Sequence, residues 1–400
     1  MADNFKFSIW TLGYLIAVIG LFLYSFTQID LGLTLSEASI WQIAEGFFKN
    51  IGYFQRPLSG NLFVGTVLSL LFFYLMILYG IYKKKINKKT VWVLIISTAF
   101  LLNFSYNAFS HDLFNYIFDA KIVTYYNQNP YIHRALDFPG DPMLSFMHWT
   151  HRLYPYGPIW LGLTVPLSFV GFQFFLPTFF LFKTLMSLSF LGTAFFIGKI
   201  LKKVSLNDEV FGIAFFALNP LVVVESLVSS HNDIVMIFFA MWSIYLLLNI
   251  QYARSLIMFM LSVGIKFATL FMLPIFLIVY SLTKQKKKIN WEIIFSLLTI
   301  LMIIPVVLAS YRTNFQPWYL LNILPFAALV SRKYYFFVPA IVLSFFSLFQ
   351  YLPFLYLGNW DNPVPLVLFR IMASAVIVSA ALVTIGFFKS TTYKSGKMVK

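Results

Sequence analysis

Apolar runs of about 20 residues recur along the whole chain, and this recurrence limits the fold more than any other feature. A helix needs about 20 mostly apolar residues to cross the hydrocarbon core of a bilayer. Hydrophobic residues make up 60% of the 400 residues and charged residues only 11%, against about 25% charged in soluble domains. The sequence therefore predicts an all-α, polytopic membrane protein of about 11–13 transmembrane or partly spanning helices. It excludes a soluble multidomain protein.

Some of the apolar runs are too short to cross a bilayer alone. These runs lie near 209–222, 255–265 and 267–282. They are interrupted at Asn219-Pro220, Lys266 and Pro274. We expect half-helices or tilted pieces there, because broken backbone at membrane depth is tolerated only where neighbouring helices shield it.

The basic residues indicate the orientation. Most of the 29 Lys and Arg residues fall in short clusters between apolar runs, such as Lys83 to Lys89 and Lys284 to Lys288. Cytoplasmic loops carry such an excess. We therefore expect a multi-pass protein of the cytoplasmic membrane with both termini inside. One of the two runs within 156–198 must be re-entrant for the charges to agree.

Chemistry is expected on the outer face. All five histidines and most of the 14 Asp and Glu residues fall on that side. The formal charge of +15 is distributed between apolar runs rather than gathered in one patch, so no nucleic-acid partner is expected. The chain has no cysteine, which excludes disulfides and thiolate chemistry. No repeat or linker divides it, so residues 1–400 are expected to form a single integral-membrane unit.

The polar stretch 110–155 is the longest outer loop, and it contains the first group of candidates. Its first part has helical periodicity that gathers Asp112, Asn115, Tyr116 and Asp119 on one face, as in a helix lying on the membrane surface. The alternative is structural: Asp112 caps the helix and Asp119 pairs with a lysine.

A second group of candidates lies near membrane depth. Glu225, His231, Asn232 and Asp233 follow one another between short apolar runs. Ionisable residues at such a depth are functional candidates by default, because they are costly unless they are paired or face a polar cavity. The alternative is a buried cluster that only satisfies the broken helices.

Two further features complete the candidates. Lys266 interrupts an apolar run, where it could instead extend to the interface. Residues 311–319 place Arg312 and Gln316 beside Trp318 and Tyr319. The fixed guanidinium fork of arginine suits a phosphate, whereas the structural alternative is an ordinary interfacial loop.

Taken together, these pieces resemble the GT-C superfamily of integral-membrane glycosyltransferases, especially the bacterial mannosyltransferases that use polyprenyl-phosphate mannose. The pieces in chain order are His111-Asp112-Leu113-Phe114-Asn115-Tyr116, Asn129-Pro130-Tyr131, Tyr154-Pro155-Tyr156-Gly157-Pro158, Asn219-Pro220-Leu221, His231-Asn232-Asp233, Ile265-Lys266-Phe267 and Gln316-Pro317-Trp318-Tyr319. The order of these pieces carries the resemblance, which extends from Asp112 to Tyr319. The chain departs from that family in two respects: three apolar runs precede the loop, and the Asp-x-Asp form is absent.

The resemblance implies a GT-C-like fold and a hexosyltransferase with an outward-facing site. It implies transfer of a hexose, with mannose favoured, from a polyprenyl-phosphate donor to a lipid or glycan acceptor. Asp112 corresponds to the catalytic base. The residues expected to bind substrate are His111, Asn115, Tyr116, Asp119, Tyr131, Tyr154, Glu225, His231, Asn232, Asp233, Lys266, Arg312, Gln316, Trp318 and Tyr319.

General chemistry agrees with this interpretation. Displacement of a phosphate from an anomeric carbon passes through an oxocarbenium-like state in which a carboxylate accepts the incoming proton, and direct attack inverts the configuration. Cations near the leaving phosphate would stabilise its charge. No cofactor and no metal ligand is assigned: the missing Asp-x-Asp leaves a divalent metal open but not expected.

Two rival classes remain at this point. A transporter or lipid-linked-sugar flippase also has many helices and charges at membrane depth, although such proteins commonly contain paired repeats. An outer-face ligase, polymerase or acyltransferase acting on lipid-linked sugars would use similar partners. The bilayer is a partner in every case.

Overall fold

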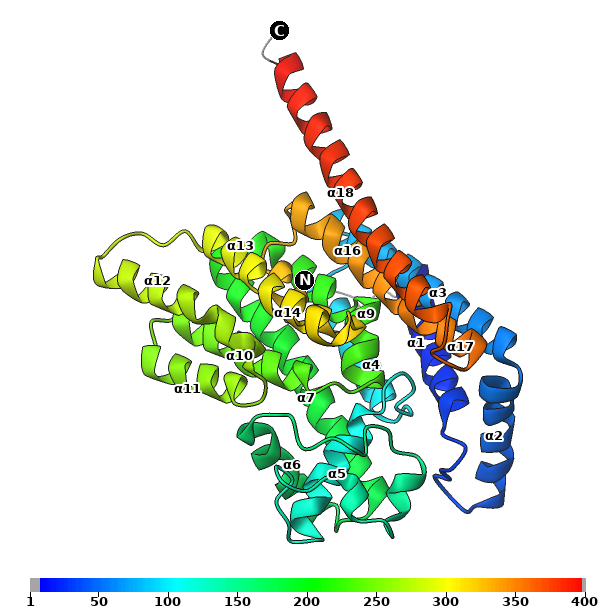
Figure 1. Cartoon of the computed structure of the whole chain (residues 1–400). Helices are drawn as coiled ribbons and strands as arrows, with labels where there is room; N and C mark the ends of the chain where they lie inside the picture. Colours follow the sequence, from blue (N-terminus) through cyan, green and yellow to red (C-terminus); the bar gives the residue numbers. More distant parts are fainter. Residues whose placement is uncertain (1–7, 398–400) are drawn as a thin grey trace.

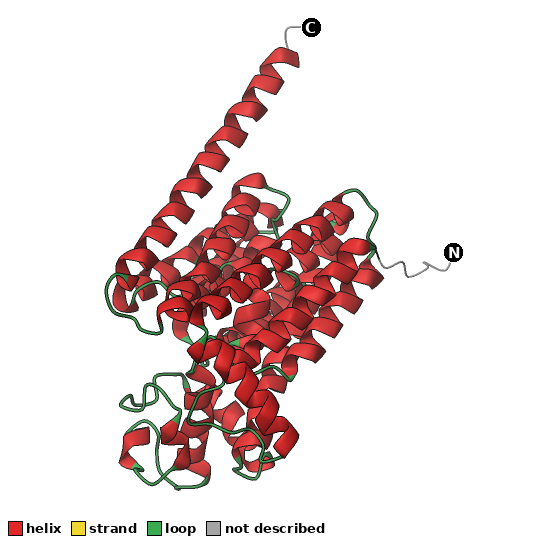
Figure 2. Ribbon diagram, turned by 90° about the vertical axis from the view of Figure 1, so that its right-hand side faces the viewer, coloured by secondary structure: helices red, strands yellow, loops and turns green. Residues whose placement is uncertain are grey.

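The computed structural model describes residues 8–397 and is all-α. Helices account for 76% of the chain, and no strand occurs among the described residues (Figures 1 and 2). The expected class, an all-α polytopic membrane protein, is therefore confirmed. The expected cytoplasmic location of the two termini concerns residues 1–7 and 398–400, which lie outside the described part.

Within residues 8–397, seven segments are long and apolar enough to cross a membrane. They are Ile9–Gln28, Arg56–Tyr82, Phe175–Val204, Phe267–Lys284, Trp291–Thr313, Tyr334–Leu357 and Val364–Phe387. An eighth crossing results if the bent pair Leu206–Ala217 and Pro220–Val228 is counted as one span. Three shorter apolar helices accompany them: Pro158–Val170, Asp233–Leu248 and Tyr252–Val263.

Local sequence explains where helices begin. Ser8 caps α1 (Ile9–Ser25) because its side chain accepts a hydrogen bond from the Thr11 backbone N–H. Asn87 does the same for α4 (Lys88–Asn103), accepting from the Thr90 N–H at 2.9 Å. Such caps satisfy backbone donors that the first turn of a helix leaves free.

The expected breaks occur where the sequence placed them. Helix α8 (Glu209–Ala217) and the segment that starts with α9 (Pro220–Val223) differ in direction by 55°. Pro220 lacks the N–H that would continue α8, and the Asn219 side chain caps the new turn by accepting from the Leu221 N–H at 3.0 Å. Helix α11 (Tyr252–Val263) ends before Lys266, and Pro274 lies in the first turn of α12 (Leu273–Lys284).

Helix α7 (Phe175–Val204) is the centre of the packing. It contacts α4, α8 and α10 (Asp233–Leu248). Helix α1 packs against α3 (Arg56–Tyr82), and α16 (Tyr334–Leu348) packs against α18 (Val364–Lys397), whose far end extends beyond the other helices in Figure 1. Besides α5 and α6, which are described next, the remaining α-helices are α2 (Ser39–Lys49), α13 (Trp291–Leu301), α14 (Ile303–Thr313), α15 (Leu324–Ala328) and α17 (Leu352–Leu357).

The segment 104–157 forms the lower end of the molecule in Figure 1, together with α6 (Pro158–Val170). It contains α5 (Asp112–Thr124), the helix expected in the outer loop. Leu113, Phe114, Ile117 and Phe118 are buried, and Tyr116, which the periodicity places on the polar face, is fully buried as well. Helix α5 packs against α6 and α7 rather than presenting an open polar face.

Of the two runs within 156–198, α6 is the one that is too short to cross. Its 13 residues extend about 20 Å, whereas the hydrocarbon core is about 30 Å thick. The 30 residues of α7 are more than sufficient.

The chain before α6 touches the loop that carries Lys266. The Gly157 N–H donates to the Ile265 carbonyl at 3.1 Å, and the Ile159 N–H donates to the Gly264 carbonyl at 2.9 Å. A Cβ atom on Gly157 would lie 2.1 Å from the Gly264 carbonyl oxygen. This position therefore requires glycine, and the close backbone contact fixes the start of the Lys266 loop.

We expect Gly157→Ala to lower the free energy of unfolding by about 1–3 kcal/mol, because the new methyl group collides with backbone that cannot move away cheaply. Thermal unfolding of the detergent-solubilised protein measures the change. Gly162→Ala, on α6 with open space around the added Cβ, is the matched control and should unfold at or slightly above the wild-type temperature, because alanine favours the helix more than glycine does. Equal unfolding temperatures for the two variants would contradict the prediction.

Candidate functional site

A wide turn brings Glu225 and His231 together. The chain from Val224 to Val228 forms a π-helix, and it ends with the Ser229 N–H donating to the Val224 carbonyl at 2.8 Å. Ser230 then adopts a left-handed conformation with φ of 53°, and the His231 N–H returns to the Glu225 carbonyl at 3.0 Å. Both π-helical turns and strained backbone recur at functional sites.

His231 lies between two carboxylates. Its Nδ1 is 3.4 Å from Asp112 Oδ2, and its Nε2 is 3.3 Å from Glu225 Oε2. The indole of Trp318 stacks on the imidazole, with ring centroids 4.1 Å apart. The side chains of His231 and Glu225 are 0% exposed, whereas that of Asp112 is 18% exposed. Asp112 is thus the member of this triad that solvent or a substrate can reach.

The two carboxylates determine the charge of the imidazole. Burial alone would lower the pKa of His231, but the contacts with Asp112 and Glu225 raise it to about 9. Burial would likewise raise the pKa of Asp112, but His231, together with Lys266 and Arg152, holds it below its ordinary value. At neutral pH the site therefore holds an ionised Asp112 beside an imidazolium.

A second ion pair lies close to the triad. Lys266 Nζ donates to Asp233 Oδ2 at 2.6 Å and lies 5.6 Å from the centre of the Tyr156 ring. Tyr116 links this side to α5, because its hydroxyl donates to Asn232 Oδ1 at 3.3 Å. The ammonium of Lys266 has three donors and gives one to Asp233, so the other two can bind a ligand.

Asp119 lies further along the same face of α5. Burial, reinforced by the negative charge of Asp112, raises the pKa of Asp119 to about 8. At neutral pH this carboxyl is therefore mostly protonated and presents a hydroxyl donor. Asn115, between the two aspartates, has a buried side-chain oxygen without a hydrogen-bond partner among the described residues.

Other expected site residues lie at the edge of this cluster or outside it. Tyr319 donates to or accepts from Thr313 Oγ1 at 2.6 Å, and Tyr154 donates to the Gly157 carbonyl at 3.1 Å. Tyr131 is 40% exposed and donates to the Tyr156 carbonyl at 3.3 Å. Gln316 immediately precedes the 3-10 turn Pro317–Asn322 that holds Trp318.

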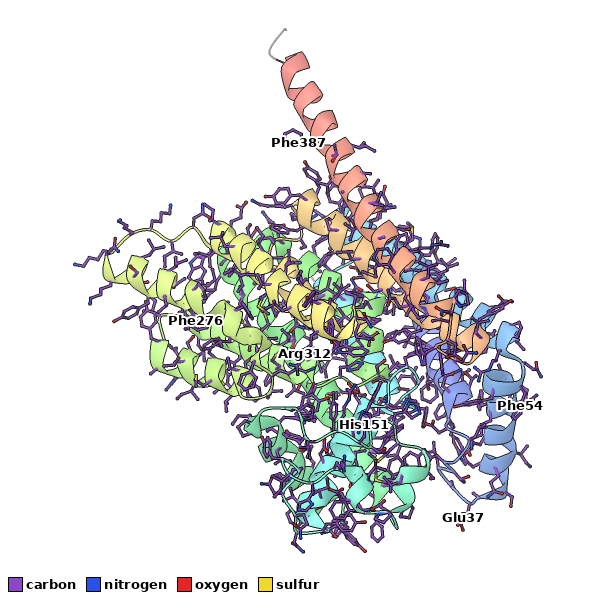
Figure 3. The ribbon with its side chains drawn as sticks, viewed as in Figure 1. Glu37, Phe54, His151, Phe276, Arg312 and Phe387 are labelled. Atoms are coloured by element: carbon purple, nitrogen blue, oxygen red, sulfur yellow. The ribbon has the colours of Figure 1, made fainter. Side chains whose placement is uncertain are left out.

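His111 and Arg312 do not join the triad. The ring of His111 faces Asp30, with Nε2 3.0 Å from Asp30 Oδ1, although the next residue is Asp112. Arg312 is exposed near the end of α14, and Figure 3 labels it at the lower edge of the bundle, above His151. It makes no ion pair among the described residues.

The structure adds residues that sequence reasoning missed. Tyr351, which follows α16, donates to Glu225 Oε1 at 2.8 Å. Arg152 is close enough to lower the pKa of Asp112. Lys183, in the first third of α7, is 1% exposed and donates to Ser105 Oγ at 2.9 Å and to the Leu227 carbonyl at 2.7 Å. Lys183 thereby secures the end of the π-helix that carries Glu225.

The triad is not arranged as a metal site. His231 meets its two carboxylates through different ring nitrogens, so a single ion cannot contact all three groups. What the cluster offers is an accessible carboxylate, with an imidazolium and two further cations around it. Such a set of groups can accept a proton and stabilise an anionic leaving group in one place.

Comparison with known proteins identifies the class. The match to a family model, together with the many helices that could span a membrane, places the chain among integral-membrane glycosyltransferases of the GT-C type. Residues 15–282 match the MptA_B family, described as "Alpha-(1->6)-mannopyranosyltransferase, N-terminal domain", and the chain belongs to that family. No curated protein and no solved structure matches the chain significantly. The expected superfamily is confirmed.

We expect Tyr351→Phe to reduce glycosyl transfer roughly tenfold, because a hydrogen bond to a charged group contributes about 1.5–3 kcal/mol. Loss of the hydrogen bond from Tyr351 allows the Glu225 side chain to move away from His231. Initial transfer rates measure the effect. Tyr311→Phe is the control, since that side chain is 94% exposed. Equal rates for the two variants would show that the Tyr351 contact has no influence on transfer.

Proposed function

We propose that the chain transfers mannose from a polyprenyl-phosphate donor to a hydroxyl of a lipid or glycan acceptor, at the outer face of the cytoplasmic membrane and with inversion. The observation that carries this proposal is the placement of Asp112 beside His231, with Lys266 and Arg152 near enough to act on its charge. The family match supports the sugar and the reaction class.

Asp112 acts as the base. The acceptor oxygen attacks the anomeric carbon while the bond from that carbon to the phosphate oxygen breaks, and the acceptor proton passes to Asp112. A carboxylate with a low pKa suits this task, because the acceptor hydroxyl becomes acidic as the new bond forms in an oxocarbenium-like transition state. Asp112 later loses the proton to water.

His231 and Glu225 hold the base. The imidazolium between Asp112 and Glu225 keeps Asp112 ionised and fixes its position, and the stacked Trp318 restricts rotation of the ring. The leaving polyprenyl phosphate gains negative charge, which Lys266 and Arg152 stabilise. Arg312 is exposed, so it can contact only a phosphate that extends to the surface.

The remaining site residues bind the sugars and the phosphate. The protonated carboxyl of Asp119 and the amide of Asn115 face the same side of α5 as Asp112, where they can hydrogen-bond sugar hydroxyls. Tyr116, Asn232 and Asp233 stabilise this side through the hydrogen bond from Tyr116 to Asn232 and the ion pair of Asp233 with Lys266. The proposed substrate-binding set also includes the buried Tyr154 and four side chains that are at least partly exposed: His111, Tyr131, Gln316 and Tyr319.

The central experiment incubates purified protein with radiolabelled polyprenyl-phosphate mannose, glucose and arabinose, together with a membrane-lipid extract as acceptor. Mannose is expected to appear in a covalent product, and its configuration to be inverted. Uptake of substrate into vesicles without a covalent product would instead favour a transporter or flippase.

Asp112→Asn should lower turnover by a factor of roughly 10²–10⁴, because it removes the base but preserves size and packing. Donor binding should remain within a few-fold of wild type, which a filter-binding measurement with the labelled donor checks. Asp137→Asn is the control: that aspartate pairs with Arg134 on an exposed turn. Near-normal turnover of the Asp112 variant would reject this residue as the base.

Lys266→Ala should weaken binding of the product polyprenyl phosphate by roughly 10- to 100-fold, the equivalent of one lost bond between charged groups. Competition against labelled donor measures the affinity. Lys121→Ala is a matched control, because Lys121 also pairs with an aspartate, Asp141 at 2.5 Å, outside the cluster. Unchanged affinity in the Lys266 variant would remove it from the phosphate site.

The orientation can be tested because the chain has no native cysteine. Ser145→Cys, in the segment 104–157, should react with a membrane-impermeant thiol reagent added outside intact cells. Lys286→Cys, in the basic loop after α12, should react only after the membrane is opened. Labelling of the Ser145→Cys variant only from the cytoplasmic side would reverse the proposed orientation.

A further inference from the structure

Three side chains from distant parts of the sequence meet at the start of α5. Asp30 follows the 3-10 turn Phe26–Gln28 after α1, His111 immediately precedes α5, and His148 lies in the loop before α6. One potential ligand atom from each lies within 4.8 Å of the other two. None of the three takes part in the Asp112–His231–Glu225 triad.

The distances suit a small divalent cation. Bonds of about 2.0–2.2 Å to nitrogen and oxygen in a tetrahedral arrangement place two ligand atoms about 3.3 Å apart. His111 Nε2 and Asp30 Oδ1 are 3.0 Å apart. The rings of His111 and His148 are stacked, with centroids 3.7 Å apart and planes at 9°, so His148 has to turn for its nitrogen to aim at the same point. His148 is exposed at the surface, which leaves its ring room to turn.

A further residue already orients the carboxylate. The Tyr106 hydroxyl donates to Asp30 Oδ2 at 2.7 Å and accepts from the Asp30 backbone N–H at 3.3 Å. Tyr106 is 1% exposed, so this support is rigid. It leaves Oδ1 to face the two imidazoles. Supporting hydrogen bonds of this kind are typical of metal-ligating carboxylates.

We propose that Asp30, His111 and His148 bind one Zn²⁺ ion, with water as the fourth ligand. Two imidazoles and one carboxylate favour zinc over the hard cations Mg²⁺ and Ca²⁺, which prefer oxygen ligands alone. The ion ties the chain after α1 to the residue before α5, and so holds the helix start that carries Asp112. The sequence alone assigns no metal ligand, and it places His111 among the substrate-binding residues.

Cobalt serves as the spectroscopic probe for zinc. The full-length protein, purified and treated with a chelator, is titrated with Co²⁺ and then with Zn²⁺, while the visible absorption of bound cobalt is followed. One cobalt per chain is expected, displaced by one zinc. His148→Ala and His111→Ala should each weaken cobalt binding at least tenfold, and Tyr106→Phe roughly 10- to 100-fold.

His133→Ala is the matched control, because His133 also lies within 4.0 Å of an aspartate, Asp137 at 3.6 Å, but without a second histidine. It should bind cobalt like the wild type. Because His148 is exposed, its variant is expected to fold, and circular dichroism checks this. The proposal is overturned if wild-type protein binds no stoichiometric cobalt, or if the His148 and His133 variants bind it equally. Neither result depends on glycosyl transfer.

Discussion

An imidazolium held between two carboxylates in a dry interior is the interaction on which the site depends. Burial of His231 alone would favour its neutral form, and the approach of Asp112 and Glu225 reverses that preference. The three groups are therefore interdependent: removal of the imidazole would leave the fully buried Glu225 carboxylate without the cation beside it, which costs several kcal/mol. This mutual dependence explains why so much of the surrounding fold serves to hold three side chains in place.

Broken helices provide that arrangement. The Asn219-Pro220 break, the π-helix and the left-handed Ser230 turn give a backbone that a continuous helix could not. Irregular backbone is tolerated at this depth because protein surrounds it on every side, and residues 219–233 are almost completely buried. The same irregularity places the start of α10 so that Asp233 meets Lys266.

Periodicity and charge predicted much of this organisation. The all-α polytopic class, the breaks at Asn219-Pro220 and Pro274, and the helix from Asp112 all follow from local sequence, since each depends on residues close together in the chain. The grouping of Glu225, His231 and Asp233 could also be predicted from the local sequence, because ionisable residues between short apolar runs are rare and costly. The roles assigned to these residues remain predictions.

Partners distant in sequence could not be predicted in this way. Tyr351 is one of 23 tyrosines, and nothing in its own neighbourhood marks it as the partner of Glu225. The different surroundings of His111 and Asp112, which are adjacent in sequence, have the same origin: successive residues at a helix start point in different directions, and only the folded chain decides what each of them meets. The local sequence around Arg152 indicates only a turn, although its charge acts on Asp112.

The buried Lys183 of α7 has a consequence for how the protein is made. A lysine within the apolar part of an isolated helix opposes transfer of that helix into lipid, by up to about 2.5–3.5 kcal/mol where it lies at the helix centre. The acceptors that offset this cost are Ser105, which has already been synthesised, and the Leu227 carbonyl, which emerges from the ribosome later. Stable integration of α7 is therefore coupled to the arrival of the segment that carries Glu225, which links biogenesis of the scaffold to completion of the site.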